Sequence, residues 1–183
     1  MITSTRHQLI AAAAALLDRG GPAAVTLREV GRAAGVSHNA PYKHFTDKDD
    51  LLAAVAEAEL APLVPQGERG DPEALMLAYV RWALSAPERF KLTFGRWSRE
   101  HAALTSTAQT ARAALRNAVE CAQSRGELPA GDSERLTALL LACAHGAADL
   151  ALSGHLARDG KGRAAPEDLV GDLFAHLRRS AGA

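Results

Sequence analysis

A stretch near the N-terminus, from Thr26 to Phe45, carries polar side chains in a place where a helix usually buries apolar ones. It reads TLREVGRAAGVSHNAPYKHF, with short helical patterns on either side of Gly35. The second pattern presents amide, imidazole and ammonium groups. A helix that lies in the major groove of DNA uses such groups to form hydrogen bonds with base edges and ion pairs with phosphates. The stretch therefore predicts a DNA-reading helix that follows a helix and a tight turn.

The residues before this helix predict two helices that position it. Spacings of three and four among apolar residues predict a first helix from about Thr5 to Arg19, which a run of glycine and proline ends. Thr26 is expected to cap the second helix, with Glu29 three residues later completing a capping box. Gly35 closes the second helix and supplies the turn.

The third and fourth helices follow directly. Ser37 is expected to cap the third helix, in which Pro41 falls at about the fourth position and removes one backbone hydrogen bond. Thr46 is expected to cap a fourth helix from Asp47 to Leu60, whose first turn is acidic and suits the positive end of the helix dipole. Phe45, between the two helices, is expected to point into the core.

The composition predicts an all-α protein of about nine helices. Hydrophobic residues make up 48% of the chain and aromatic residues only 4%, which is typical of alanine-rich helical proteins. We expect an N-terminal three-helix helix-turn-helix DNA-binding domain over residues 1–47 and a C-terminal helical ligand-binding and dimerisation domain over residues 48–183. A linker is expected at Pro62, Pro65, Gly67 and Gly70, and further helices at about 71–85, 87–95, 98–125, 132–156 and 166–179.

Charge is distributed unevenly, although the formal net charge is zero. Residues 1–48 contain six lysines and arginines against three acidic residues, which gives +3 and leaves −3 for the remainder. A basic segment of this kind is typical of a part that meets phosphate. We see no apolar run of about 20 residues and no export signal. We therefore expect a cytoplasmic protein with no membrane partner, whose cysteines, Cys121 and Cys143, are reduced and buried.

These features together resemble the DNA-binding domain of TetR-family transcriptional regulators. The resemblance rests on the capped second helix, Gly35-Val36-Ser37, the run Tyr42-Lys43-His44-Phe45 and the following Lys48-Asp49-Asp50-Leu51-Leu52. Further on, His145-Gly146 resembles a Trp-His-Gly motif that names one subtype of the C-terminal domain, with Ala144 where the tryptophan would stand. The resemblance implies a homodimer that binds a roughly palindromic operator in double-stranded DNA, usually as a repressor, and that releases it when a small molecule binds.

The expected DNA contacts lie on the second and third helices. At the exposed start of the third helix, Asn39 can pair with adenine and Ala40 can contact a thymine methyl group. The family sometimes reads guanine from the position of Arg28, and the alternative for this residue is a solvated or salt-bridged arginine. The other expected contacts, mostly to phosphate, are Thr26, Ser37, His38, Tyr42, Lys43, His44 and Lys48.

A small hydrophobic effector is expected in the C-terminal domain, because most of the few aromatic residues fall in one part of the sequence. Pockets for such molecules are lined by aromatic residues with a few polar groups, although large residues at helical spacing also form ordinary cores. His145 and Asp149 share one face of the eighth helix and are expected either to meet the ligand or to form a structural pair. The expected ligand contacts are Met76, Tyr79, Trp82, Phe94, Trp97, His145 and Asp149.

The last two helices are expected to form the homodimer interface. Small residues on the eighth helix permit close approach of a partner helix, and an apolar stripe runs along the ninth. A four-helix bundle between two copies would hold the two DNA-reading heads about one turn of DNA apart, roughly 34–36 Å, or a multiple of this spacing. The residues concerned are Ala138, Ala142, Gly146, Leu169, Leu173, Phe174 and Leu177.

Two other functions stay open at this point. The chain can be a DNA-binding regulator that has no small-molecule effector and responds to a protein partner or to nothing. It can also be a helical enzyme with His145 and Asp149 as acid and base, but no nucleophile or phosphate-binding glycine loop accompanies them. No spacing among the histidines and cysteines matches a zinc site, so we expect no metal, no cofactor and no enzyme activity.

Overall fold

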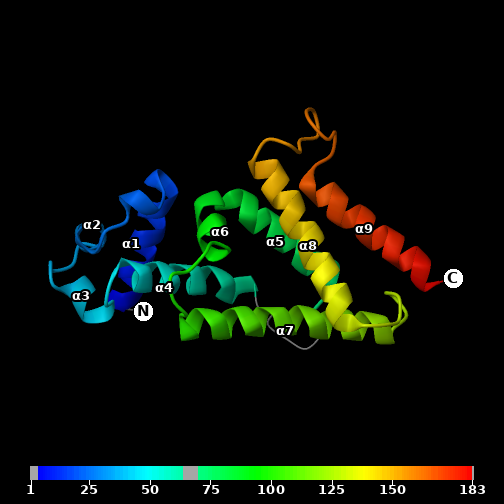
Figure 1. Cartoon of the computed structure of the whole chain (residues 1–183), viewed down its shortest axis with the longest axis horizontal. Coiled ribbons are helices and arrows are strands. Elements are labelled where there is room, and N and C mark those ends of the chain that lie inside the picture. The colour runs from blue at the N-terminus through cyan, green and yellow to red at the C-terminus, as the bar shows by residue number, and fades with distance from the viewer. Residues whose placement is uncertain (1–3, 64–69, 183) are drawn as a thin grey trace. The chain divides into compact units, whose positions relative to one another are not determined.

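The computed structural model describes residues 4–63 and 70–182, and within these ranges the chain forms helices and no strand (Figure 1). The all-α prediction of about nine helices is therefore confirmed. Of the predicted linker, Pro65 and Gly67 lie outside the described residues. The helices are α1 (Thr5–Gly20), α2 (Leu27–Ala33), α3 (Ala40–His44), α4 (Lys48–Leu60), α5 (Pro72–Ser85), α6 (Pro87–Thr93), α7 (Ala102–Ser124), α8 (Ser133–Leu152) and α9 (Pro166–Ala181), with short 3-10 turns η1 (Pro22–Ala24) and η2 (Ala61–Leu63).

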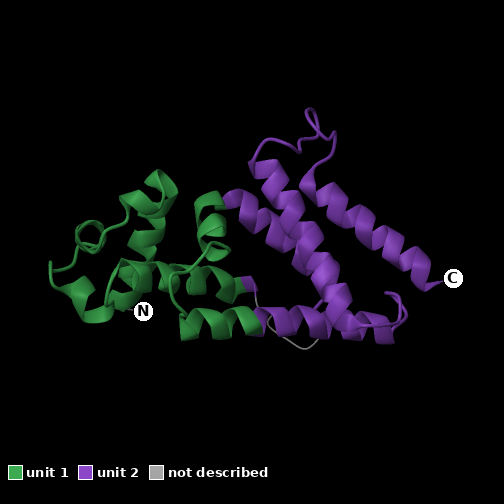
Figure 2. Ribbon diagram, in the orientation of Figure 1, with its two compact units in different colours: residues 1–62, 86–109 green, residues 63–85, 110–183 purple. Residues whose placement is uncertain are grey.

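The chain divides into two compact units, each built from two separate stretches of sequence (Figure 2). The N-terminal unit comprises Met1–Pro62 and Ala86–Gln109, and the C-terminal unit comprises Leu63–Ser85 and Thr110–Ala183. Helix α6 and the first residues of α7 therefore belong with the predicted DNA-reading helices. The two units are defined by contacts between residues and not by function. The predicted boundary between a DNA-binding and a ligand-binding domain after residue 47 therefore stays a prediction.

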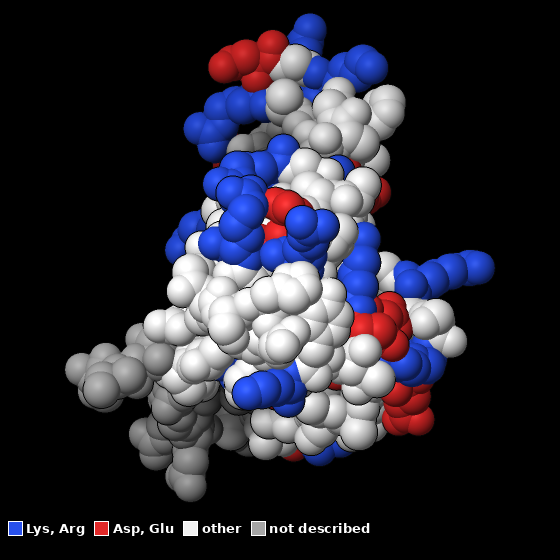
Figure 3. Space-filling model, turned by 90° about the vertical axis from the view of Figure 1, so that its left-hand side faces the viewer, with Lys and Arg blue, Asp and Glu red and all other residues white. Residues whose placement is uncertain are grey.

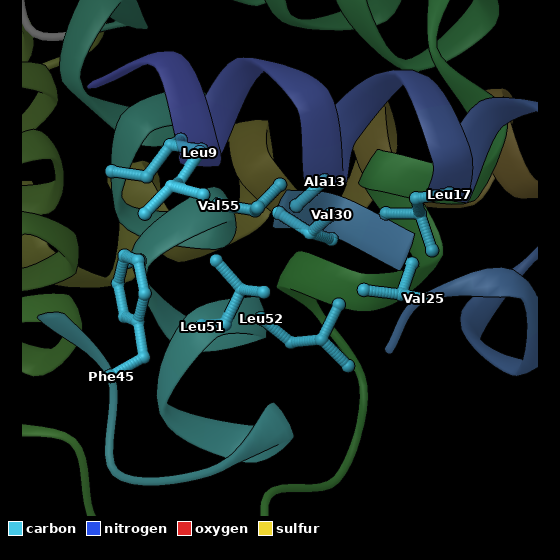
Figure 4. Close-up of a cluster of buried hydrophobic side chains, with 11 residues drawn as sticks. Leu9, Ala13, Leu17, Val25, Val30, Phe45, Leu51, Leu52 and Val55 are labelled. Carbon is cyan, nitrogen blue, oxygen red and sulfur yellow. The ribbon is translucent and has the colours of Figure 1, made fainter. Parts of the chain in front are cut away.

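Apolar side chains from α1, α2 and α4 meet in the core of the N-terminal unit (Figure 4). Leu9, Ala13 and Leu17 of α1 have no exposed surface, and Leu51 of α4 packs with them. Burial of each leucine contributes about 1.5–3 kcal/mol to the free energy of unfolding. Phe45 is only 3% exposed and joins this cluster, which confirms that it points inward.

The ends of the helices agree with the sequence at α2 and differ from it at α3 and α4. The Thr26 hydroxyl accepts a hydrogen bond from the backbone N–H of Glu29 (3.1 Å), so Thr26 caps α2 as predicted. Helix α3 begins only at Ala40, and its N-cap residue, Asn39, makes no capping hydrogen bond. The prediction that Ser37 caps α3 is therefore wrong.

Two further corrections concern Pro41 and the start of α4. Pro41 occupies the second helical position, where the missing N–H breaks no internal hydrogen bond. The cost expected for a proline at the fourth position therefore does not arise. Helix α4 is capped by Asp47, whose carboxylate accepts from the Asp50 N–H (2.8 Å), and not by Thr46.

Arg89 of α6 joins three helices of the N-terminal unit. Its Nε donates to Oδ1 of Asp18 on α1 (3.0 Å), and its Nη1 donates to Oε1 of Glu59 on α4 (2.8 Å). The Arg89 side chain is 26% exposed and that of Glu59 only 15%. This ion-pair network holds α6 against the helices that support α3.

Helices α5, α8 and α9 pack against one another in the C-terminal unit. Phe174 and Val170 of α9 and Leu140 of α8 are each at most 1% exposed. Arg178 near the end of α9 donates to the carboxylate of Glu73 at the start of α5, which ties the two helices together.

Helix α8 is long and apolar enough to cross a membrane by length and composition alone, which the sequence analysis did not predict. Core helices of soluble proteins can have the same length and composition. One face of α8 packs on α5 and α9, but only 28% of the apolar window is buried. Its other face therefore exposes apolar surface within the described structure.

We expect Arg89→Met to lower the free energy of unfolding by about 1–3 kcal/mol, because the hydrogen-bonded ion pairs of Arg89 with Asp18 and with the largely shielded Glu59 are lost. Arg96→Met is the matched control, since Arg96 is exposed and forms no ion pair within the described residues. Urea unfolding followed by circular dichroism measures both variants. Equal stability of the two variants would contradict a structural role for the network.

Candidate nucleic-acid interface

A tight turn joins α2 to α3. Gly35 has φ +66°, a left-handed conformation that glycine adopts without strain. The backbone N–H of Gly35 donates to the Arg32 carbonyl (3.2 Å), and the N–H of Val36 donates to the Gly31 carbonyl (3.2 Å). These two bonds end α2 and reverse the chain, so the arrangement of helix, turn and helix is the one that the sequence predicts.

Most of the predicted base-reading and phosphate-binding side chains are exposed around α3. Ser37, His38, Asn39, Lys43 and His44 are all exposed, and Ala40 is half-buried. The Tyr42 side chain is 54% exposed although it is large and partly apolar. Its ring lies edge to face with that of His38, with centroids 6.0 Å apart. The local structure thus brings these side chains together on one exposed surface.

The two arginines of α2 differ in their partners. Arg32 donates two hydrogen bonds to the Glu29 carboxylate (3.0 and 2.7 Å). Arg28 is exposed and forms no ion pair within the described residues. The salt-bridged alternative for Arg28 is therefore not what the structure has, and its guanidinium is available to an external partner.

Lys48 has a partner inside the protein. Its ammonium group donates to the carbonyl oxygen of Pro22 in the turn η1. This bond ties the start of α4 to the turn that precedes α2. Sequence reasoning did not find this role, because Pro22 and Lys48 lie far apart in the chain.

A second group of polar contacts, which we call the α4 clasp, fastens the segment between α6 and α7 to the start of α4. Oδ2 of Asp49 accepts from the Ser98 hydroxyl (2.9 Å) and lies 3.0 Å from Nε2 of His101. Oδ1 of Asp47 accepts from Nη2 of Arg99 (3.0 Å). The sequence carries no local signal for these pairs, because each joins residues about fifty positions apart.

Hydrogen bonds at the start of α4, those of the α4 clasp among them, lower the pKa of both carboxylates. The hydrogen bond with His101, supported by that from Ser98, lowers the pKa of Asp49 below its ordinary value. The Asp50 N–H and the Arg99 guanidinium lower the pKa of Asp47 in the same way. Both carboxylates therefore stay ionised and hydrogen-bonded at neutral pH.

Figure 3 shows the charges in a view from the side on which α2 and α3 are drawn in Figure 1. Blue lysine and arginine side chains, together with several red acidic side chains, lie around a broad uncharged area. Exposed lysines and arginines beside uncharged surface suit the pattern of DNA recognition, in which cations meet phosphate and neutral groups meet bases.

The predicted effector contacts fall in both units. Met76 and Tyr79 are buried in the C-terminal unit, each 5% exposed. Trp97 packs against the core of the N-terminal unit, and Phe94 of the same unit is 43% exposed. Close sequence spacing therefore did not place these aromatic residues in one unit.

His145 is paired with a tyrosine and not with Asp149. The Tyr79 hydroxyl and Nδ1 of His145 form a hydrogen bond (2.8 Å), and the Trp82 ring lies 5.8 Å from that of Tyr79. Burial raises the pKa of Tyr79, so its hydroxyl stays protonated and can donate. Asp149 is exposed. The expected structural pair of His145 and Asp149 is thus replaced by a bond between α8 and α5.

An open hollow of about 480 Å³ lies elsewhere in the C-terminal unit. None of the predicted effector contacts lines it. Among the described residues, those that line it are Gly70, Asp71, Cys121, Ser124 and Arg125.

The predicted dimer residues of α8 lie on its exposed face. Ala138 and Ala142 are exposed and Gly146 is half-buried. Leu139 and Leu150, which the sequence analysis omitted, are 49% and 45% exposed. The spacing 139, 142, 146, 150 would have identified both leucines had the small-residue stripe been extended to larger side chains.

On α9 the predicted stripe is only partly at the surface. Leu169, Leu173 and Leu177 are half-buried. Phe174 is 1% exposed and fills the core of the C-terminal unit, so its inclusion among the surface contacts was wrong. A position one residue from the stripe points about 100° away from it around the helix.

Two domain families match the chain, one in its N-terminal part and one in its C-terminal part. Residues 9–55 match bacterial regulatory proteins of the tetR family, and residues 73–176, more than half of the chain, match the tetracyclin repressor-like C-terminal domain. The subtype named for the Trp-His-Gly motif stays a prediction. No curated protein matches the chain.

Several solved structures have the same fold. A protein of unknown function from Rhodococcus sp. RHA1 is 30% identical, with 97% of this chain and 95% of that chain covered and a TM-score of 0.80. SmeT, the repressor of the Stenotrophomonas maltophilia multidrug efflux pump SmeDEF, is 26% identical, with 95% and 90% covered and a TM-score of 0.67. RolR in complex with resorcinol is 20% identical, with 97% and 90% covered and a TM-score of 0.63.

We expect Asp49→Asn to lower the midpoint of thermal unfolding at neutral pH and to flatten its dependence on acid. Because folding lowers the pKa of Asp49 below its usual value of 3.8, its contribution to stability is complete above that value. The contribution disappears as the pH falls through the folded-state pKa. The unmodified protein should therefore lose more stability than the variant between about pH 5 and pH 2.

Circular dichroism melts over this pH range measure the effect. Asp172→Asn is the control, because Asp172 is an exposed aspartate with no ion pair within the described residues. Parallel pH profiles for the unmodified protein and Asp49→Asn would show that the α4 clasp does not contribute.

Proposed function

The chain belongs to the TetR family of bacterial regulatory proteins and is a DNA-binding transcriptional regulator, and we propose that it is a repressor which a small molecule releases from a palindromic operator. The family consists of regulators, so the chain is not an enzyme. A regulator of this kind acts on DNA in the cytoplasm, which is the compartment we propose for it. SmeT, which shares the fold at 26% identity, is a repressor.

The observation that carries the proposal is the exposed polar surface of α3. Asn39 is the N-cap residue of this helix, but its side chain makes no capping hydrogen bond, so its amide can pair with an adenine edge. Tyr42 and Lys43 are exposed on the following turn, within reach of a phosphate backbone. In our proposal Asn39, Ala40 and Arg28 read bases, and Ser37, His38, Tyr42, Lys43 and His44 hold the backbone.

Thr26 and Lys48 take supporting roles in this proposal. The Thr26 hydroxyl already accepts the capping hydrogen bond of α2, and the Lys48 ammonium already holds the Pro22 carbonyl. Each retains hydrogen-bonding capacity for one further partner, since a hydroxyl can also donate and an ammonium group has three donors. A phosphate contact by either residue therefore adds to its structural bond.

The unburied apolar face of α8 supports a homodimer. Leu139 and Leu150 are about half exposed, and Ala142 and Gly146 between them permit close approach of a second helix. An isologous interface formed by this face and the leucines of α9 would bury these side chains in two copies at once. Two heads held at a fixed spacing explain why the proposed operator is palindromic.

The Tyr79–His145 pair supports an effector site in the C-terminal unit. It places a hydroxyl and an imidazole beside the Trp82 ring and Met76 on α5, which suits a small, mainly hydrophobic molecule with one polar group. RolR, which shares the fold, binds resorcinol, an aromatic molecule with hydroxyl groups. Release of DNA then follows from linkage, because an effector that prefers mis-spaced heads weakens operator binding by the ratio of its two affinities.

One observation favours a second candidate, a DNA-binding regulator without a small-molecule effector. Met76 and Tyr79 are 5% exposed, and Tyr79 already has His145 as a partner, so side chains occupy much of the space at this position. Titration of the protein–operator complex with a panel of small phenols distinguishes the two candidates. Operator release at micromolar concentration supports the first candidate, and unchanged binding across the panel favours the second.

Selection of operators from random duplex DNA, repeated across a salt series, tests the proposed function. A repressor that reads sequence should recover a palindrome whose half-sites are spaced by one DNA turn or a multiple of it. Recovery of random sequence with a steep salt dependence would mean that the head grips phosphate without reading bases.

We expect Asn39→Ala and Tyr42→Ala to affect DNA binding in different ways. Asn39→Ala should relax preference at particular base pairs, at a cost of about 1–3 kcal/mol each, because a bidentate base contact is lost. Tyr42→Ala should weaken operator and random DNA by similar factors, because a phosphate contact carries no sequence information. Fluorescence anisotropy on both DNAs measures this, and an equal loss for Asn39→Ala on both would refute its role as a base reader.

We expect the double variant Leu139→Asp, Leu150→Asp to be monomeric at concentrations where the unmodified protein is a dimer, because four buried carboxylates would have no partners. Sedimentation equilibrium measures the molecular mass. Ala108→Asp, which adds a charge at an exposed position of α7, should leave the dimer intact. A dimeric double variant would place the interface elsewhere.

A further inference from the structure

Helices α2 and α3 approach each other where Gly31 faces Pro41. Both residues are buried. A β-carbon added to Gly31 would lie 2.9 Å from Cγ and 3.4 Å from Cδ of the Pro41 ring. Carbon atoms pack at about 3.5–4.0 Å, so any side chain at position 31 would displace the ring. Position 31 thus accepts only glycine while Pro41 keeps its place.

The same glycine also takes part in the turn. Its carbonyl oxygen accepts the Val36 N–H, so the backbone of α2 at this point holds the turn as well as the proline ring. Pro41 in turn accepts the Phe45 N–H through its carbonyl (2.9 Å), which is the bond at the end of α3. The contact between the two residues therefore connects the turn with the full length of α3.

Helix α3 depends on such a contact because it is short and has no side-chain cap. It spans five residues, Ala40–His44, and isolated helices of this length are unstable in water. Packing must therefore fix its direction. Pro41 near its start and Phe45 just beyond its end are buried, while Tyr42, Lys43 and His44 between them are exposed.

We infer that Gly31 and Pro41 act as a positioning pair, which sets the angle of α3 against α2 and thereby decides which base pairs Asn39 can reach. The inference rests on the proposed reading of DNA by α3. Both residues are buried, so neither touches DNA, and their effect on sequence preference passes through the orientation of α3.

A double-mutant cycle on the full chain tests this pair. The four proteins are the unmodified protein, Gly31→Ala, Pro41→Ala and the combination of both. Val30→Ala is the matched control, because Val30 is the neighbouring buried residue, belongs to the core cluster and lowers stability without filling the space beside Pro41. Affinities for the selected operator and for random duplex DNA are measured at a temperature at which all five proteins are folded, together with their unfolding midpoints.

Gly31→Ala should weaken operator binding by about tenfold to a hundredfold, the equivalent of one or two lost base contacts. Its affinity for random DNA should change by less than about threefold, because phosphate contacts tolerate a tilted helix. The combined variant should recover operator affinity to within about threefold of the unmodified protein, since alanine at position 41 removes the ring atoms that a β-carbon would meet. Val30→Ala should bind the operator normally while melting earlier.

Three results would overturn the inference. Normal operator binding by Gly31→Ala would show that the ring yields without moving α3, and no recovery in the combined variant would show that Pro41 is not the obstacle. Equal losses for Gly31→Ala and Val30→Ala would reduce the effect to stability. If the unmodified protein selects no operator, the proposed function fails and the positioning role fails with it. In that case, the coupling between the two substitutions in the free energy of unfolding still reports whether Gly31 and Pro41 are in contact.

Discussion

A helix of five residues has no stability of its own in water, and the N-terminal unit is organised around that constraint. Helix α3 is held at one end by Pro41 against Gly31 and at the other by Phe45 in the core cluster. Burial of apolar side chains from α1, α2 and α4 stabilises the unit, and α3 has no side-chain capping hydrogen bond. Its polar side chains are consequently left for an external partner.

Polar contacts at the start of α4, just after α3 in the chain, also help to fix the position of α3. Lys48, Asp49 and Asp47 at the start of α4 each bond to a residue distant in sequence. Arg89 adds a further link among α1, α4 and α6. The start of α4, only a few residues after α3, is thereby fixed by a turn before α2 and by a segment after α6. A movement of the segment after α6 would therefore shift the start of α4, which follows α3 directly in the chain.

Periodicity and capping rules predicted the helix count, the turn at Gly35, the cap at Thr26 and the inward side chain of Phe45. They placed the start of α3 too early, because Ser37 has the side chain of a good cap, whereas the helix begins at Ala40, next to the Pro41 ring that packs against Gly31. They also paired His145 with Asp149, because four-residue spacing is visible in sequence and the Tyr79 contact between α5 and α8 is not. Long-range pairs such as Asp49 with His101 leave no local trace, so that part of the site could be found only in three dimensions.

The division of the N-terminal unit into two stretches has a consequence for how the protein is made. Residues 1–62 contain the whole helix-turn-helix, yet Arg89 and His101 arrive only with residues 86–109. During synthesis at about 5–20 residues per second, the head therefore spends several seconds without these partners. Closure across the intervening C-terminal segment also raises the contact order of the unit, which slows folding relative to a helical bundle of purely local contacts. A nascent chain can thus form the recognition motif early but completes its support only after roughly half of the polypeptide has left the ribosome.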